Sequence, residues 1–328
     1  MRNKIKDRAE RAIQEKVFPG CVIGVVRKNG DRTIMPFGNF TYESDSQKVM
    51  EDTVYDLASV TKSIPAASLA LTLISEGKFR ARDAVREYLP ELKNDYGATV
   101  EDLLTYRVKG TRLSTLHDKT PDEILGIVFQ NGFEGVPGRA EYTNLPALLV
   151  GLIVERVGDD TLQNLAQKYF FEPLGTHDTT FFPADISRVP PTEVVGGSEV
   201  CGIVHDESAR IFAFRGRAVG HAGLFSTAPD ILNFLEALLA GKLPAVLAGA
   251  KKGFGWQRAE SWFMGSHFGE GSFGKTGFTG TSVAVDPERD VAFVILSNRT
   301  YPQRPPDAAS IHSAINTFRA DIADILLR

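Results

Sequence analysis

The segment CVIGVVRKNGDRTIMPFG, residues 21–38, indicates the fold most directly. Its first six residues form an apolar, β-branched run, which is typical of a buried strand. The dipeptide Asn29-Gly30 is a strong signal for a tight hairpin turn. A second strand at about 32–38 would then complete a β-hairpin near the start of the chain.

A second hairpin is predicted near the other end of the chain. Residues 282–286 and 291–296 are rich in valine and other apolar residues, and an Asp286-Pro287 turn follows the first of them. The chain between the two hairpins is mainly helical. Helices are predicted over about 3–16, 62–77, 144–157, 229–240 and 308–327.

These elements predict an α+β fold. One antiparallel sheet would be built from both termini and flanked by the terminal helices, with a mainly helical lobe inserted between its two halves. We expect residues 1–65 and 256–328 to form the sheet lobe and residues 66–255 to form the helical lobe. The active site would lie in the cleft between the two lobes.

The composition is that of an ordinary globular protein and excludes several function classes. The chain has 328 residues, of which 43% are hydrophobic and 24% charged, and its net charge of -4 argues against a nucleic-acid partner. No apolar run is long enough for a transmembrane helix. Residues 1–16 are highly charged and lack the apolar core of a secretory signal, so the sequence as written predicts a cytoplasmic protein, although a trimmed secreted form would look the same.

Cysteine and histidine spacing gives no sign of a metal site or a disulfide framework. The chain has two cysteines, Cys21 and Cys201, and neither lies at zinc-ligand spacing from other ligands. The six histidines never fall at positions i and i+4, and no Gly-x-Ser-x-Gly elbow is present. A zinc hydrolase and a Ser-His-Asp hydrolase are therefore disfavoured, and no cofactor is expected.

The pattern Ser-x-x-Lys occurs three times, at 59–62, 75–78 and 272–275. Ser75 would lie in the last turn of a helix, where carbonyl groups repel an oxyanion. Ser272 would lie on a strand, where residues three apart face opposite sides. Only Ser59 is predicted at the start of a long helix, where Lys62 shares its face and free backbone amides favour a developing anion. The alternative is a plain N-cap serine beside a solvated lysine.

Tyr142-Thr143-Asn144 is the second candidate element. A serine hydroxyl needs a base, and a lysine must have its pKa lowered before it can act as one. Tyr142 could share the proton, because a loop-like segment ends here and a helix begins just after Asn144. Both side chains could then point into a cleft. Alternatively, they are a buried tyrosine and an N-cap asparagine.

The third element is the glycine-rich segment 273–280, which contains Lys275-Thr276-Gly277. Its glycines would let another backbone approach a strand edge closely, so a substrate amide or ester could pair there as an added strand. Lys275 would add a positive charge for a substrate carboxylate or an anionic leaving group. The alternative is a glycine-rich turn with a solvated lysine.

Together the three elements resemble the serine β-lactamase and penicillin-binding-protein superfamily. The Tyr-x-Asn element is most similar to its class C branch, which also holds D,D-carboxypeptidases, D-aminopeptidases and esterases. The resemblance covers most of the chain and makes the structural alternatives above improbable when taken together. Further similar segments are Phe18-Pro19-Gly20, 54–62, 99–105, Pro137-Gly138, 220–227, 274–281 and Asp286-Pro287.

The resemblance implies roles for eight residues. Ser59 would be the acylated nucleophile, and Lys62 and Tyr142 would carry its proton to the leaving group. Asn144 would hold the Lys62 amine and the substrate amide. The remaining residues, namely Lys275, Thr276, Gly277 and Phe278, would bind substrate, with the amides of Ser59 and Phe278 forming an oxyanion hole.

Three segments are harder to interpret by resemblance. After 102–105 such proteins usually have His-Thr-Ser-Gly, whereas this chain has the bulkier and more basic Tyr106-Arg107-Val108-Lys109-Gly110. Residues 202–209 resemble a motif of carboxypeptidase- and esterase-like members, so His205 or Asp206 could line the cleft or could stabilise a loop. His221 is expected to be structural.

The sequence therefore predicts a serine hydrolase that cleaves an ester or amide, such as a D-amino-acid peptide, a β-lactam or a carboxylic ester, through a Ser59 acyl-enzyme. The alternative is a catalytically silent penicillin-binding or sensor protein. The partner would be a small-molecule or short-peptide substrate, and the sequence does not indicate an oligomeric state.

Overall fold

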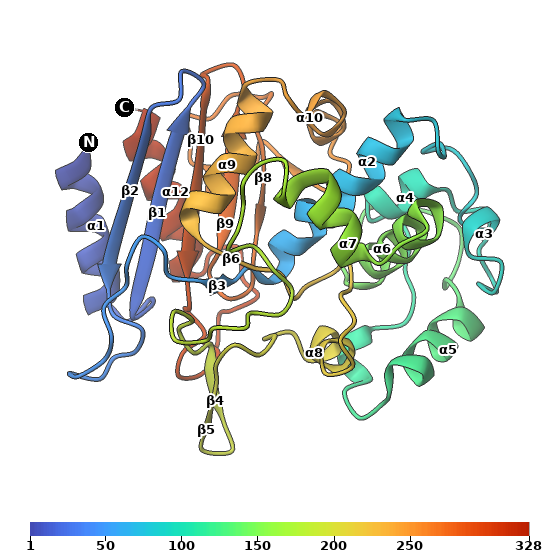
Figure 1. The fold of residues 1–328 in the computed structure, drawn as a ribbon, viewed down its shortest axis with the longest axis horizontal. Helices are drawn as coiled ribbons and strands as arrows, with labels where there is room; N and C mark the ends of the chain where they lie inside the picture. Colours follow the sequence, from blue (N-terminus) through green and yellow to red (C-terminus); the bar gives the residue numbers. More distant parts are fainter. Residues whose placement is uncertain (328) are drawn as a thin grey trace.

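Strands from both ends of the chain form one antiparallel sheet in the computed structural model, which describes residues 1–327 (Figure 1). The strand order is β2-β1-β10-β9-β8-β7. Both predicted hairpins are confirmed, and they are joined within the sheet by the pairing of β1 with β10. The strands are β1 (Gly20–Arg27), β2 (Arg32–Gly38), β7 (Gln257–Arg258), β8 (Phe273–Thr276), β9 (Ser282–Asp286) and β10 (Val291–Ser297).

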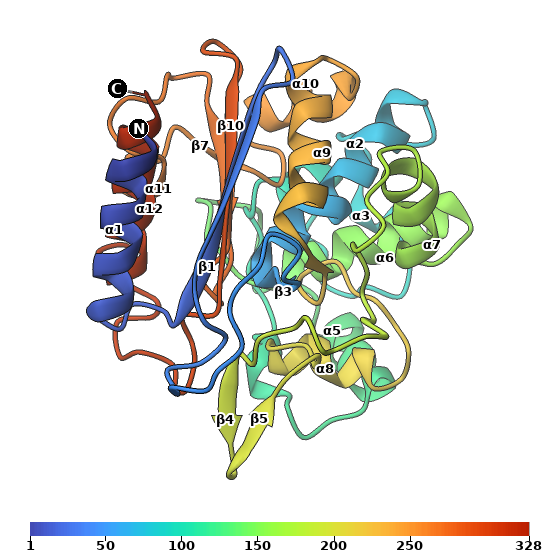
Figure 2. The same ribbon diagram turned by 60° about the vertical axis from the view of Figure 1, so that its left-hand side comes forward.

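Helices cover both faces of this sheet. Figure 2 shows α1, α11 and α12 on one face and α9 on the other. Because both faces are covered, every residue of β1 except Arg27 is buried, and the strand is apolar throughout instead of alternating. The edge strand β2 tolerates Pro36, since an edge position leaves its missing amide unneeded. These helices are α1 (Arg2–Gln14), α9 (Ala228–Leu239), α11 (Ser261–Met264) and α12 (Ala314–Leu327).

The remaining helices lie to one side of the sheet (Figure 1), as expected for a helical segment inserted between the two halves of the sheet. They are α2 (Ser68–Ser75), α3 (Val85–Tyr88), α4 (Val100–Leu104), α5 (Pro121–Asn131), α6 (Leu145–Gly158), α7 (Leu162–Ala166), α8 (Glu207–Ala213) and α10 (Pro244–Lys251). Two short strand pairs join β3 (Tyr55–Asp56) to β6 (Phe225–Ser226) and β4 (Glu193–Val195) to β5 (Ser198–Val200). The division into two lobes at the predicted boundaries stays a prediction.

The predicted helix over 62–77 is not continuous. A 3-10 turn covers Ala58–Lys62, a wider turn covers Ser63–Ala67, and α2 begins only at Ser68. The break falls at Ile64, whose φ of -119° and ψ of 107° are extended, because a residue that precedes a proline disfavours the helical region. The stretch Ala58–Ser75 is long and apolar enough to cross a membrane, but 78% of it is buried within the protein, as in a core helix.

The last helix also starts later than predicted, at Ala314 instead of about residue 308. The Asp307 carboxylate accepts a hydrogen bond from the Ala314 amide at 3.2 Å, and this satisfies one of the free amides of the first turn. The residues in between therefore form a loop, and part of that loop, from Ala308 to Ile311, lines a pocket beside Ser59.

Candidate active site

Ser59 lies in a strained turn instead of at the start of a long helix. The preceding residue, Ala58, has a φ of +46°, in the left-handed region that alanine rarely adopts. The Asp56 carboxylate holds this conformation by accepting the Ala58 amide at 2.7 Å. Such strain persists only where the surroundings fix it, and it is common at functional sites. The Ser59 amide still lies in the first turn, where helix amides lack an acceptor in the preceding turn.

Lys62 contacts the Ser59 hydroxyl, as the Ser-x-x-Lys spacing predicts. Its Nζ donates to Ser59 Oγ at 2.9 Å and to the carbonyl oxygen of His221 at 2.6 Å. The side chain is buried, with 1% of its surface exposed. Burial lowers the pKa of Lys62 to about 8, although the Asp206 carboxylate acts in the opposite direction. A useful fraction of the amine is therefore neutral near physiological pH.

Tyr142 lies between two lysines. The Lys275 ammonium is 4.1 Å from the centre of its ring, and the Lys62 ammonium is 5.4 Å from it. The phenol interacts with the Ser59 hydroxyl. Neighbouring residues displace water and raise the pKa of Tyr142, although 53% of the tyrosine surface stays accessible. The phenol is therefore protonated at neutral pH.

Lys275 is buried on β8, and burial makes its positive charge less favourable. Burial, followed by the nearby charge of Lys62, holds the pKa of Lys275 well below its usual range. The tyrosine rings of Tyr106 and Tyr142 offer their π faces to its ammonium, which partly offsets that cost. An anionic substrate group arriving next to Lys275 would favour its protonated form.

Tyr106 belongs to the site, although the sequence marked it only as a departure from the usual His-Thr-Ser-Gly. Its ring lies 5.3 Å from the ring of Tyr142 and packs against it at 43°. Its carbonyl accepts the Glu141 amide at 2.8 Å, which ties the loop before Tyr142 to residue 106. Its backbone is left-handed, with a φ of +56°. Tyr106 thus fixes the position of Tyr142.

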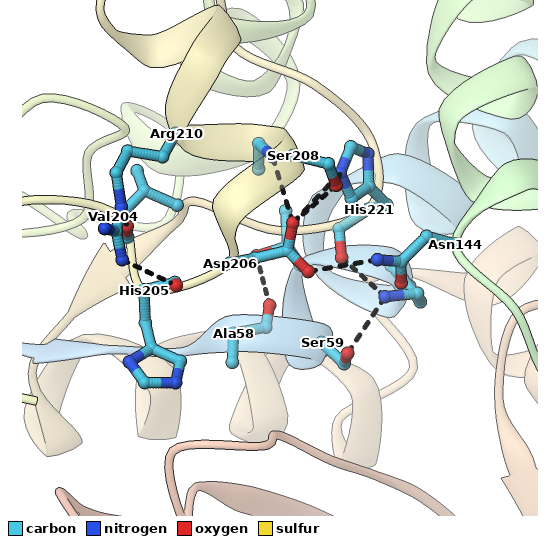
Figure 3. Close-up of polar contacts among 12 residues, drawn as sticks. Ala58, Ser59, Asn144, Val204, His205, Asp206, Ser208, Arg210 and His221 are labelled. Carbon is cyan, nitrogen blue, oxygen red and sulfur yellow. Dashed lines mark hydrogen bonds and ion pairs between the residues drawn. The ribbon is translucent and has the colours of Figure 1, made fainter. Parts of the chain in front are cut away.

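Asn144 is held by a carboxylate and not by Lys62. Its Nδ2 donates to Asp206 Oδ2 at 3.0 Å, and no hydrogen bond joins it to Lys62 within the described chain (Figure 3). The other Asp206 oxygen accepts from Ser208 at 2.6 Å and lies 3.5 Å from His221 Nε2. Asn144 begins α6 (Leu145–Gly158) without capping it through its side chain. Asp206 therefore organises the polar centre of the site.

The charges around Asp206 explain its ionisation. Burial opposes the negative charge, but hydrogen bonds from His221 and Ser208 and the charge of Lys62 outweigh it and lower the pKa of Asp206. The His221 imidazole is itself fully buried, and burial lowers its pKa. The expected structural role of His221 is consistent with these contacts, but its backbone carbonyl also touches Lys62. No sequence pattern signals that contact.

A pocket of about 400 Å³ opens beside Ser59. It is lined by five of the predicted residues, namely Ser59, Tyr142, Thr276, Gly277 and Phe278. The Phe278 amide donates to no protein acceptor in residues 1–327, so it is available to a ligand. A larger pocket of about 510 Å³ lies between Glu15 and Ile315 and contains none of the predicted residues.

The turn between β8 and β9 is fastened to the segment that carries Ser59. Thr279 and Thr281 donate their hydroxyls to the carbonyls of Asp56 and Leu57, at 2.7 and 2.9 Å. Gly277 is required here, because a Cβ at this position would lie 2.4 Å from the Leu57 carbonyl oxygen. The glycine therefore allows the close approach of another backbone, as predicted, and the backbone that approaches here is the protein's own segment around Leu57.

The other Ser-x-x-Lys matches have no such surroundings. The exposed Ser75 hydroxyl donates to the Thr72 carbonyl, and the buried Ser272 hydroxyl contacts the sulfur of Met264. Among residues 1–327, no cluster of His, Cys, Asp and Glu side chains could hold a metal ion.

A serine, a buried lysine and a tyrosine are arranged in this way beside the sheet, and the comparison with known families agrees with this arrangement. Residues 5–315 match the Beta-lactamase family. The chain belongs to that family and is a hydrolase of the β-lactamase, carboxypeptidase and esterase type.

Curated relatives match over most of their length. A protein of Escherichia coli (strain K12), named as a D-alanyl-D-alanine carboxypeptidase, is 26% identical over 320 residues, which cover 79% of this chain and 73% of the relative. An N-acetylmuramyl-L-alanine amidase of Bacillus subtilis (strain 168) is 26% identical over 353 residues, covering 87% of this chain and 78% of the relative.

Solved structures show the same fold. EstCE1, a hydrolase with promiscuous acyltransferase activity, superposes with a TM-score of 0.79 at 18% identity and covers 99% of this chain and 98% of its own. A class C β-lactamase from Rhodobacter sphaeroides superposes with a TM-score of 0.73 at 20% identity, covering 99% of both chains.

Proposed function

We propose that this protein hydrolyses esters or amides through a covalent acyl-enzyme on Ser59. The observation that carries the proposal is the 2.9 Å hydrogen bond between the buried Lys62 amine and the Ser59 hydroxyl, at the edge of an open pocket. A lysine with a pKa of about 8 is about one-tenth neutral at pH 7, so it can accept a proton without a histidine.

Acylation begins when Ser59 Oγ attacks the substrate carbonyl carbon and passes its proton to the neutral Lys62 amine. The oxyanion accepts hydrogen bonds from the amides of Ser59 and Phe278, which the pocket leaves available. Tyr142, protonated at neutral pH, gives its proton to the leaving group and takes back from Lys62 the proton that Ser59 released. Water then attacks the ester on Ser59 by the reverse proton route and releases the acid.

The substrate class is a small ester or a short peptide-like amide. Both curated relatives are named for amide bonds that involve alanine. A pocket of about 400 Å³ fits a short peptide end. A substrate carboxylate near Lys275 would meet an amine whose protonation it favours. Hydrolysis of esters and alanine-containing peptides is therefore proposed ahead of β-lactam hydrolysis.

An intact-mass time course with 4-nitrophenyl acetate, and separately with a penicillin, tests this proposal. Nitrophenol and unreacted penicillin are measured in the same tubes. We expect a mass gain equal to one acyl group, mapped to Ser59 by peptide digestion, with continued release of nitrophenol. An adduct on another residue contradicts the proposal. A permanent Ser59 adduct with both substrates and no turnover would support the silent penicillin-binding alternative.

The activity should depend on pH through Lys62. Only the neutral amine can accept the serine proton, so kcat/KM for a nitrophenyl ester should rise with pH and level off above about 8. The measurement is a pH profile from 5.5 to 9.5, with the Ser59→Ala variant as the blank for spontaneous hydrolysis. A profile that is flat or falls across this range is incompatible with Lys62 as the base.

Asp206 should tune that profile. An Asp206→Asn variant loses the negative charge that raises the pKa of Lys62, so the midpoint of the profile should move to lower pH. The variant also weakens the hold on Asn144, and we expect about a tenfold lower plateau, the value of one hydrogen bond to a charged group. The exposed Asp31→Asn serves as the control. An unchanged or higher midpoint contradicts this coupling.

A further inference from the structure

A second, smaller pocket opens beside Ser59. Its volume is about 130 Å³, equal to about four molecules of liquid water. It shares Ser59 and Phe278 with the 400 Å³ pocket, so the two pockets meet at the reacting serine. Tyr142, the proposed proton donor to the leaving group, lines only the larger pocket. The leaving group therefore belongs in the larger pocket, and the smaller one is left for the acyl group.

His205 is a buried wall of the small pocket with unused hydrogen-bonding capacity. Only 2% of its surface is exposed, and neither ring nitrogen has a hydrogen-bond partner in the described chain. The residue is nevertheless held firmly, because its amide donates to Asp56 Oδ2 at 2.7 Å and its ring stacks on Phe278. Figure 3 shows the ring turned away from the Asp206 cluster. A buried polar group without a partner is costly, and here a bound ligand could satisfy it.

The Nε2 atom of His205 can act as a hydrogen-bond acceptor. Burial lowers the pKa of His205 to about 4, so its imidazole is neutral at physiological pH. Its Nδ1 lies 3.7 Å from a carboxylate oxygen of Glu193, which favours the tautomer that carries the proton on Nδ1. The lone pair is then on Nε2, and this nitrogen can only accept a hydrogen bond.

The charges of the small pocket also favour a ligand group that donates a hydrogen bond. Asp206 and Glu207 line it with carboxylates, against the single guanidinium of Arg304. That guanidinium is already engaged, because it donates to both oxygens of Glu193 and lies 2.5 Å from Glu207. The side chains that line this pocket therefore offer hydrogen-bond acceptors, and their net charge is negative by one unit. A carboxylate in this pocket would be repelled.

We propose that this pocket selects acyl groups that carry a short hydrogen-bond-donating substituent, a hydroxyl or an ammonium, and that His205 Nε2 accepts its hydrogen bond. The inference rests on the proposed function, because it places the acyl group of the Ser59 ester in this pocket. It narrows the substrate class from any small acyl group to hydroxyacyl and aminoacyl groups. Plain alkanoyl groups of the same shape would leave His205 without a partner.

Two trios of 4-nitrophenyl esters test the proposal. The first comprises 3-hydroxypropanoyl, 3-aminopropanoyl and butanoyl esters. The second comprises lactoyl and alanyl esters, each as both enantiomers, and the achiral 2-methylpropanoyl ester. Within each trio the end group changes from hydroxyl or ammonium to methyl at nearly constant shape. Each kcat/KM is divided by the rate of hydroxide hydrolysis of the same ester, which removes intrinsic reactivity.

In at least one trio, a hydroxyl or ammonium ester should exceed its methyl counterpart about tenfold in the wild type. The His205→Phe variant, which keeps a stacked ring, should bring that ratio close to one, and His205→Gln, which keeps an acceptor, should retain part of it. His117→Phe, at an exposed histidine, is the matched control and should keep the full ratio.

Three results would overturn the inference. The methyl esters could be preferred or equal in both trios, the preference could survive in His205→Phe, or a carboxylate-bearing succinyl ester could be the best substrate. In each case wild-type turnover of the esters leaves the proposed function standing. If the wild type hydrolyses none of the esters and Ser59 gains no acyl group, the proposed function fails, and this inference fails with it.

Discussion

A Ser59→Ala variant is expected to lose at least about 10,000-fold in kcat/KM for a nitrophenyl ester and to form no adduct with that ester. The oxygen that forms the covalent bond is removed, while the pocket and the amides that face the oxyanion remain. Removal of a serine nucleophile elsewhere has effects of this size, with residual rate coming from the remaining groups. The rate is measured by nitrophenol release, and the adduct by intact mass.

The chain supplies its own control for this variant. Ser75→Ala removes the serine of another Ser-x-x-Lys match, at an exposed helix position where the hydroxyl donates to the Thr72 carbonyl. It should retain wild-type activity. If Ser59→Ala retains more than one-tenth of the activity, or if Ser75→Ala loses as much as Ser59→Ala does, the nucleophile has been assigned wrongly.

A Lys62→Met variant should lose about 100- to 10,000-fold in the same assay, the range typical of a general base. Methionine matches the length of the buried stem but cannot take the serine proton. The rise in activity with pH should also disappear, because its midpoint belongs to the Lys62 amine. The thermal stability of the variant should not fall below that of the wild type, since the variant no longer buries an amine whose charge the site disfavours.

Lys78→Met, at the exposed lysine of the second Ser-x-x-Lys match, is the corresponding control and should behave like the wild type in rate and in pH profile. Retention of a pH-dependent rate in Lys62→Met would mean that another group accepts the proton. Tyr142 would then be the next residue to replace.

The sheet was predictable because its strands carry local signals. The Asn29-Gly30 turn and the apolar run before it suffice for one hairpin, and the Asp286-Pro287 turn suffices for the other. The helical pattern after Ser59 does not predict the break at Ile64, although the proline that follows, Pro65, disfavours a helical backbone at that residue. The late start of α12 (Ala314–Leu327) depends on a side-chain contact from Asp307, which no periodicity reports.

The site was predictable where spacing along one turn determines geometry, as for Ser59 and Lys62. Tyr142 and Lys275 could be grouped with them only through the family resemblance. Long-range partners could not be foreseen: Asp206 meets Asn144 across 62 positions, and the His221 carbonyl meets Lys62 across 159. Tyr106 has no spacing signal at all, because its role depends on a ring contact and a left-handed backbone.

The pairing of β1 (Gly20–Arg27) with β10 (Val291–Ser297) has a consequence for how the protein is made. A ribosome releases the first hairpin long before the strand that must lie beside it exists. The turn that is fastened to the Ser59 segment also belongs to this late part of the chain. The segment that carries Ser59 is therefore synthesised long before this turn, because Thr279 lies 223 positions after its partner Asp56, and a nascent chain holds Ser59 without that fastening until the later turn has emerged.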